Sequence, residues 1–200
     1  MNEIEVFNQS LFLRINAGIG TPAWAINTAC GIADELVYLI PALLLAFWLW
    51  GSETKRSLAI KSCLVAMLGV GINQVIGLYW QHPRPVMIGL GHAWIPHTAD
   101  SSFPSDHMTV FVSVGLTFLF DGSLWFGLAT LIFSVGVAWA RIFLGVHFPM
   151  DMFGALVVAV YSCIIMSPIW QRAATSATGF LERVYQTVLA LPIGAGWIRR

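Results

Sequence analysis

Three short segments of the chain hold the residue types that phosphoryl transfer requires. The first is His-Pro-Arg-Pro at 82–85, the second is Pro-Ser-Asp-His at 104–107, and the third is Arg-x5-His-x3-Asp at 141–151. Phosphoryl transfer needs cations around the phosphate oxygens, a nucleophile, and an acid for the leaving oxygen. The arginines and histidines of these segments are candidates for all three roles.

The two arginines are the candidate phosphate-binding cations. The guanidinium groups of Arg84 and Arg141 are planar forks that bind phosphate oxygens in pairs. Ser105 lies just before a predicted span, where serine is a frequent helix cap and the first amides of a helix face an anion site. We therefore assign these three residues to the predicted phosphate site.

The histidines divide into a nucleophile and an acid. Asp151 follows His147 by four residues, and the intervening Pro149 is typical of the first position of a helix. Asp151 then lies in the first turn, where its carboxylate accepts a hydrogen bond from one ring nitrogen of His147 while the other nitrogen attacks. His107 is the candidate general acid.

Each residue taken singly also has a structural interpretation. Arg84 and Arg141 can be interfacial anchors that snorkel, and the His147–Asp151 pair can be a hydrogen bond that only stabilises the fold. The Asp34-Glu35 pair can pair with a cation, line the cavity or lie at the interface. The three segments together are far more specific and favour a catalytic site. Three other histidines are typical of loop positions: His82, His92 and His97.

The composition is that of a membrane protein. Of 200 residues, 58% are hydrophobic and 10% are charged, with a mean hydropathy of +0.76, whereas soluble domains hold roughly 25% charged residues. The length suits one domain, residues 1–200. Zero net charge gives no electrostatic basis for nucleic-acid binding. The three cysteines lack metal-ligand spacing, and neither a metal nor a cofactor is predicted.

Membrane helices are predicted to position the three segments, because a span needs ~20 mainly apolar residues. Segments 4–17 and 180–189 carry apolar residues at helical spacing and are predicted amphipathic helices, which either lie on the membrane or pack on the bundle. The predicted fold is all-α, a polytopic bundle of about five to six transmembrane helices with amphipathic helices at both termini. The expected spans are 23–50, 57–80, 108–120 (or from 105), 123–146 and 150–170.

Charge sidedness orients this bundle. If the loop 51–56 is cytoplasmic, seven of the ten basic residues fall inside, in agreement with the positive-inside rule. All five histidines then fall outside, together with Asp100, Asp106 and Asp151. Polar residues near membrane depth are costly and usually functional. We therefore expect the site at the outer face, with membrane lipids as neighbours.

The motifs resemble those of the type 2 phosphatidic acid phosphatase superfamily. The family pattern is Lys-x6-Arg-Pro, Pro-Ser-Gly-His and Ser-Arg-x5-His-x3-Asp. Beyond the motifs, the chain is most similar to the bacterial undecaprenyl-diphosphate phosphatases, including the C-terminal region from Ala190 to Trp197. The motifs stand here as Gly77-x6-Arg84-Pro85, Pro104-Ser105-Asp106-His107 and Ala140-Arg141-x5-His147-x3-Asp151.

The resemblance implies a metal-independent phosphatase of a bacterial inner membrane. It implies His147 as a nucleophile that forms a phosphohistidine, His107 as the acid and Asp151 as the residue that orients the nucleophile. The substrate would be undecaprenyl diphosphate, converted to the monophosphate at the periplasmic face to recycle the carrier for cell-wall synthesis. Bacitracin resistance would accompany this activity.

Three positions depart from the family pattern. Gly77 replaces the lysine, Asp106 replaces a glycine beside the acid, and Ala140 replaces a serine. A carboxylate at 106 repels a phosphate unless it points away or pairs with an arginine. The accessory candidates are Asp106, His97, Asn73 and Gln74.

Other functions stay open at this point. Within the enzyme class, the site also suits phosphatidic acid, phosphatidylglycerol phosphate or lipid A, with either water or an alcohol as the phosphoryl acceptor. A relative that binds without turnover is a further alternative, whereas the hydropathy argues against a soluble haloperoxidase. A transporter or channel needs ionisable residues through its depth, but here they gather at one face. Oligomeric state is not predicted.

Overall fold

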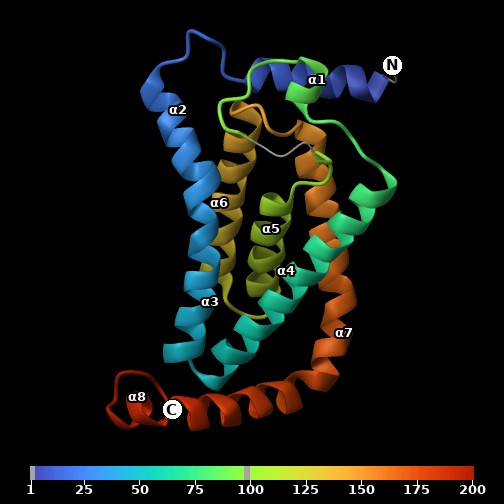
Figure 1. Cartoon of the computed structure of the whole chain (residues 1–200). Coiled ribbons are helices and arrows are strands. Elements are labelled where there is room, and N and C mark those ends of the chain that lie inside the picture. Colours follow the sequence, from blue (N-terminus) through green and yellow to red (C-terminus); the bar gives the residue numbers. More distant parts are fainter. Residues whose placement is uncertain (1–2, 97–99) are drawn as a thin grey trace.

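The computed structural model describes residues 3–96 and 100–200, and every regular element in them is a helix (Figure 1). The predicted all-α fold is therefore confirmed. The elements are α1 (Glu3–Ile15), α2 (Ala23–Cys30), η1 (Gly31–Glu35), η2 (Leu36–Tyr38), α3 (Leu39–Trp50), α4 (Glu53–Tyr79), η3 (Pro85–Ile88), α5 (Asp106–Phe120), α6 (Leu124–Phe143), α7 (Pro149–Val188) and α8 (Ala190–Gly194).

Four helical segments in the described part of the chain are long and apolar enough to cross a membrane. They are 23–50, which joins α2 to α3 through η1 and η2, and the helices α4, α6 and α7. The fifth predicted span is α5, which is apolar but has 15 residues. Large apolar side chains such as Leu78, Trp125 and Ile132 are more than 70% exposed on these helices, as expected of surfaces that face lipid. The chain is a multi-pass membrane protein.

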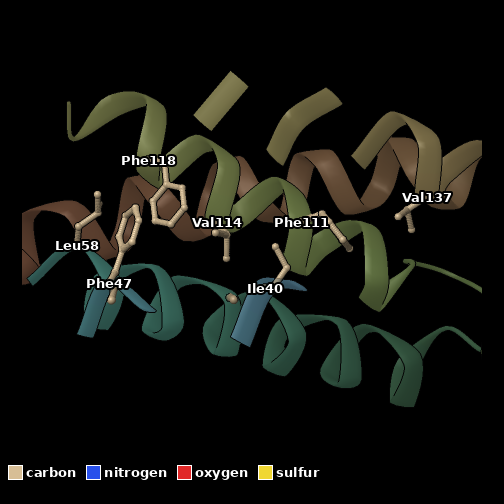
Figure 2. Close-up of a cluster of buried hydrophobic side chains, with 9 residues drawn as sticks. Ile40, Phe47, Leu58, Phe111, Val114, Phe118 and Val137 are labelled. Atoms are coloured by element: carbon tan, nitrogen blue, oxygen red, sulfur yellow. The ribbon is translucent and has the colours of Figure 1, made fainter. Parts of the chain in front are cut away.

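The short helix α5 occupies the centre of the bundle, between α4, α6 and α7 (Figure 1). Its apolar side chains pack into the main core with residues of α3, α4 and α6. Phe47 of α3 stacks on Phe118 of α5, with ring centroids 5.3 Å apart. Figure 2 shows this core, which includes Ile40, Phe47, Leu58, Phe111, Val114, Phe118 and Val137. This packing fixes the position of α5, whose first residues carry the second motif.

The last span and the predicted C-terminal amphipathic helix form one helix of 40 residues, α7. Pro168 lies near its middle, and a proline inside a helix removes a hydrogen bond and bends the axis. The lower part of α7 turns and runs across the end of the bundle toward α8 (Figure 1). The predicted segment 180–189 is therefore helical, but it is the continuation of α7.

The N-terminal helix α1 lies across the opposite end of the bundle (Figure 1). The sequence left open whether this helix rests on the membrane or packs on the bundle. Phe12 is fully buried against Phe148, and Asn8 accepts a hydrogen bond from the amide of Met150 at 3.0 Å. One face of α1 therefore packs on the bundle, while Ile4 and other apolar side chains of α1 stay exposed.

Candidate active site

A cavity of about 520 Å³ opens at the end of the bundle that carries α1, between α4, the start of α5 and the loop that joins them. Helix ends from α4, α5, α6 and α7 meet here, as the sequence predicts. Two candidate residues, Ser105 and Asp151, are fully buried beside the cavity. The candidates that line it are Asn73, Gln74, Arg84, Asp106, His107, Arg141 and His147, together with Gly77.

The backbone around His147 sets the tautomer of its ring. Nδ1 of His147 lies 2.9 Å from the carbonyl oxygen of Ser102. A carbonyl oxygen only accepts hydrogen bonds, so Nδ1 must carry the hydrogen. Nε2 is then the unprotonated nitrogen, and it lies 3.4 Å from Nη1 of Arg84. In the neutral ring, the lone pair of Nε2 thus faces the guanidinium group of Arg84.

Asp151 stands behind His147 as predicted. Pro149 is the first residue of α7, so Asp151 lies in the first turn, and its Oδ2 is 3.2 Å from Nδ1 of His147. The same oxygen accepts the amide of Phe148 at 2.7 Å and the hydroxyl of Ser102. Asp151 is fully buried, and these donors offset part of the loss of its hydration, whereas Oδ1 has no hydrogen-bond partner among the described residues. This network fixes the orientation of the ring.

Arg84 donates hydrogen bonds to three residues in two parts of the chain. It is 4% exposed, and it donates to Oδ1 of Asp100 from Nε at 2.9 Å. Nη1 donates to the carbonyl oxygen of Val146 at 2.8 Å, and Nη2 donates to that of Ser101 at 3.3 Å. Because Val146 precedes His147, this contact places the guanidinium group beside the ring of His147.

Arg141 and His107 are in direct contact. Nη2 of Arg141 lies 2.6 Å from Nδ1 and 3.2 Å from Nε2 of His107, while Nη1 donates to Oδ1 of Asp34 at 3.3 Å. Arg141 is 3% exposed, and its Nε has no hydrogen-bond partner among the described residues. Arg141, the second candidate cation, and His107, the candidate acid, thus form one group that lines the cavity.

Ser105 differs from the expectation of a helix cap. It occupies the N-cap position of α5, but its side chain makes no cap hydrogen bond. Its hydroxyl is buried without a partner in the described part of the chain. The backbone amide of Ser105 instead donates to the carbonyl oxygen of Asp151 at 3.3 Å. Ser105 therefore ties the start of α5 to the start of α7, with its hydroxyl buried beside the cavity.

Asp106 lines the cavity, and its hydrogen-bond donors among the described residues are side-chain amides rather than the arginine that its charge led us to expect. Its Oδ1 accepts from the amide of Asn73 at 2.8 Å and its Oδ2 accepts from the amide of Gln74 at 2.9 Å. Asn73 also donates to Thr109 at 2.9 Å. These two amides of α4 lie one turn before Gly77, where the family has its lysine. The carboxylate thus fastens α5 to α4 through neutral donors.

Three further residues join the site: Ser102 and Asp100 had no role predicted from the sequence, whereas pairing with a cation was one of the alternatives for Asp34. Ser102 orients both His147 and Asp151, Asp100 pairs with Arg84, and Asp34 pairs with Arg141. The signal for Asp34 was its position inside an apolar span, whereas backbone contacts such as that of Ser102 leave no signal in a single sequence. His82 lines the cavity, and His97 lies outside the described residues.

The turn between α6 and α7 is fixed by α1 and by the α4–α5 loop. Gly145 has a φ of +82°, and a side chain there would overlap the carbonyl oxygen of His92. Asn16 donates to the carbonyl oxygens of His92 at 2.9 Å and Phe143 at 3.0 Å, and it accepts from the amide of His92 at 2.8 Å. These contacts hold the turn that carries His147.

The described residues contain no group of three or more His, Cys, Asp or Glu side chains arranged to hold a metal ion. The groups that are present are two buried guanidinium groups and two histidines around one cavity. Such a set can bind a phosphoryl group, attack it through nitrogen and protonate a leaving oxygen.

A sequence model of the PAP2 superfamily matches residues 58–174, more than half of the chain. The chain belongs to the PAP2 superfamily. The matched region holds all three motifs and the helices α5 and α6, together with most of α4 and the membrane-spanning part of α7. The resemblance stated from the motifs is therefore confirmed, and with it the prediction of a membrane phosphatase.

Known PAP2 proteins agree with this placement. The chain is 37% identical over 196 residues to the putative undecaprenyl-diphosphatase YbjG of Escherichia coli (strain K12), covering 98% of this chain and 99% of that protein. It is 32% identical over 161 residues to the undecaprenyl-diphosphatase BcrC of Bacillus subtilis (strain 168), covering 79% of this chain and 81% of that protein. These relatives confirm the expected bacterial branch.

The fold also has a match among solved structures. The structure of LpxE from Aquifex aeolicus superposes with a TM-score of 0.67 at 21% identity, covering 80% of this chain and 94% of that one. At this identity the match concerns the fold alone. The PAP2 fold therefore accounts for the arrangement of the helices around the cavity.

Proposed function

We propose that this PAP2 protein hydrolyses undecaprenyl diphosphate to undecaprenyl phosphate through a phosphohistidine at His147. The names of two relatives that match most of the chain support the substrate. Release of the carrier lipid as its monophosphate would return it to cell-wall synthesis. The site itself supports the phosphoryl chemistry, and one observation carries it: Nδ1 of His147 faces a carbonyl oxygen, so Nε2 is free of hydrogen beside Arg84.

The first half of the reaction forms the phosphoenzyme. Nε2 of His147 attacks the terminal phosphorus, and the bond from phosphorus to the bridging oxygen breaks. His107 gives its proton to the departing lipid monophosphate. Arg84 and Arg141 bind the equatorial oxygens, where negative charge is concentrated in the transition state. The ring of His147 becomes cationic, and Asp151 stabilises it from the Nδ1 side.

The second half of the reaction restores the enzyme. Water attacks the phosphorus, and His107, now neutral, accepts a proton from the water. The bond from nitrogen to phosphorus breaks, so inorganic phosphate leaves and Nε2 of His147 regains its lone pair. The proton taken from water leaves His107 protonated, ready to act as the acid again. No residue beyond those of the cavity is required for this cycle.

The proposed orientation places the site at the periplasmic face of a bacterial inner membrane. The residues that line the cavity belong to the end of the bundle that carries α1, and α1 lies opposite α8 and the C-terminal end of the chain (Figure 1). The loop and helix residues at that other end include Lys55, Arg56 and Arg183. The positive-inside rule supports a cytoplasmic location for them. Cysteine labelling from the periplasm at position 92, compared with position 55, tests this orientation.

Phosphate release from the purified protein tests the function. Undecaprenyl diphosphate should be hydrolysed faster than phosphatidic acid or phosphatidylglycerol phosphate, and a chelator should not change the rate. His147→Ala should abolish release, whereas His92→Ala should not, because the side chain of His92 is exposed and only its backbone contacts Asn16. A His147→Ala variant with the wild-type rate contradicts the mechanism. Faster transfer to an added alcohol or lipid than to water would instead indicate a phosphotransferase.

A further inference from the structure

A short π-helical segment, η1, interrupts the span 23–50 at Gly31–Glu35 and carries Asp34. A π turn adds a residue to the helix and changes the direction in which the following side chains point, and such turns are frequent at functional sites. An ionised side chain within a span is costly unless it is paired. Asp34 thus combines two features that are frequent at functional sites, an acidic side chain within a span and a π-helical turn.

The partner of Asp34 is the buried cation of the third motif. Oδ1 of Asp34 lies 3.3 Å from Nη1 of Arg141, whose side chain is 4% exposed. The same guanidinium contacts His107 through Nη2, at 2.6 Å from Nδ1. Asp34 and His107 therefore hold different nitrogens of one planar fork. Rotation of the guanidinium would break one of these contacts.

The charges around this group show what Asp34 contributes. A guanidinium that has lost its hydration needs a counter-ion. Of the other carboxylates at the cavity, Asp100 pairs with Arg84 and Asp106 binds the amides of Asn73 and Gln74. Asp34 is the carboxylate that supplies this counter-ion to Arg141. It does so from η1, which lies outside the segment 58–174 that matches the PAP2 superfamily.

We propose that Asp34 is a positioning residue that holds Arg141 in the orientation needed for phosphoryl transfer. The proposal rests on the proposed function, in which Arg141 binds the transferred phosphoryl group and His107 protonates the leaving oxygen. Asp34 fixes the fork and offsets part of its charge before the substrate arrives. Without Asp34, the cation attracts the anionic substrate more strongly but no longer holds it in the reactive geometry.

The substitution Asp34→Asn separates these two effects. We expect kcat to fall by about tenfold, because a misplaced cation stabilises the transition state less. We expect KM to fall by about threefold, because the charge of Arg141 is no longer offset. A loss of folded protein lowers kcat but leaves KM unchanged, so the fall in KM distinguishes the two causes. Wild-type values of both constants would overturn the proposal.

Two further variants control this experiment. Glu35→Gln removes the adjacent acid of η1, for which the described part of the chain shows no ion pair, and should change neither constant. Asp34→Glu keeps the charge and should retain kcat within about threefold, with an unchanged KM. If Asp34→Asn does not fold, the kinetics of Asp34→Glu are used to test the proposal. An inactive Asp34→Glu protein with the thermal midpoint of the wild type would contradict the proposal.

A double-mutant cycle with Arg141→Lys tests whether Asp34 acts through Arg141. In that background, Asp34→Asn should have less than a third of its effect, whereas additive losses would overturn the proposal. The four proteins of this cycle are also compared by the rise in thermal midpoint that orthovanadate causes on binding. Orthovanadate mimics phosphate, so this measurement does not require the lipid substrate. If the lipid diphosphate is not hydrolysed, the proposed function fails, and coupling in orthovanadate binding still decides the role of Asp34.

Discussion

The carbonyl oxygen of Ser102 lies 2.9 Å from Nδ1 of His147, closer than the 3.2 Å that separates this nitrogen from Oδ2 of Asp151. Two acceptors therefore hold the same ring hydrogen. One of them is a backbone atom that no side-chain substitution removes. The tautomer of the proposed nucleophile is thus determined by the α4–α5 loop as well as by the carboxylate.

The shared hydrogen bond predicts a moderate effect of Asp151→Asn. We expect kcat to fall by about 10²-fold, less than the roughly 10⁴-fold loss found where a carboxylate alone sets the tautomer. Ser102→Ala removes the hydroxyl that donates to Asp151 but leaves the carbonyl, so it should cost no more than about tenfold. Steady-state kinetics on both variants measures this difference. A loss of roughly 10⁴-fold for Asp151→Asn would show that the carbonyl contact does not help to set the tautomer.

The geometry of Arg84 predicts that charge alone does not replace it. Arg84→Lys keeps the charge, but one ammonium group cannot reach Asp100, the carbonyl of Val146 and a phosphate together. We expect kcat/KM to fall by about 10²-fold, because the fork is lost as well as the position of the cation. Asp100→Asn, which removes a competing carboxylate, should lower KM. Wild-type kinetics for Arg84→Lys would contradict the assigned role.

The pairing of Asp106 predicts an effect on stability. Asp106→Ala leaves the buried amide of Asn73 without its carboxylate acceptor, although its bond to Thr109 remains. We expect the free energy of unfolding to fall by about 1–3 kcal/mol. Thermal unfolding in detergent measures this loss, with Glu53→Ala at the exposed start of α4 as the control. If Asp106→Ala is as stable as the wild type, the contacts to α4 do not stabilise the site.

The contacts of Asn16 predict that the N-terminal helix supports the nucleophile. Asn16→Asp has the same shape, but its carboxylate faces the carbonyl oxygens of His92 and Phe143 in place of a donor. We expect a loss of about 2–4 kcal/mol in stability and a lower kcat, because the turn before His147 moves. Ser10→Ala, at an exposed position of α1, is the matched control. Unchanged stability and kcat would exclude this role for α1.

Most of the fold follows from hydropathy and from the residues that mark where helices begin and end. The apolar segments predict the spans because a helix is how a single segment satisfies its backbone in lipid. Pro149 correctly marks the start of α7 and places Asp151 in its first turn. The continuity of α7 through Pro168 could not be predicted, because a proline either ends or bends a helix and packing decides which. The short α5 was predicted with nearly its observed bounds.

The motifs identify which residues gather at the cavity, but not how they are paired. His147, His107, Arg84 and Arg141 lie together as the sequence predicts. Long-range partners are not visible in one sequence, because they depend on how separate helices meet. The pairs of Asp106 with Asn73 and of Arg141 with Asp34 are examples, whose partners are 33 and 107 positions apart in the sequence. The roles of all these residues in the reaction stay predictions.

Trapping of the phosphoenzyme tests the central claim most directly. The protein is mixed for milliseconds with undecaprenyl diphosphate labelled in its terminal phosphate, quenched in base, and digested for mass mapping. We predict a base-stable, acid-labile label on Nε2 of His147 that is absent from His147→Ala and present in His92→Ala. Phosphate release in a single turnover without any labelled protein, or with the label on another residue, would contradict it.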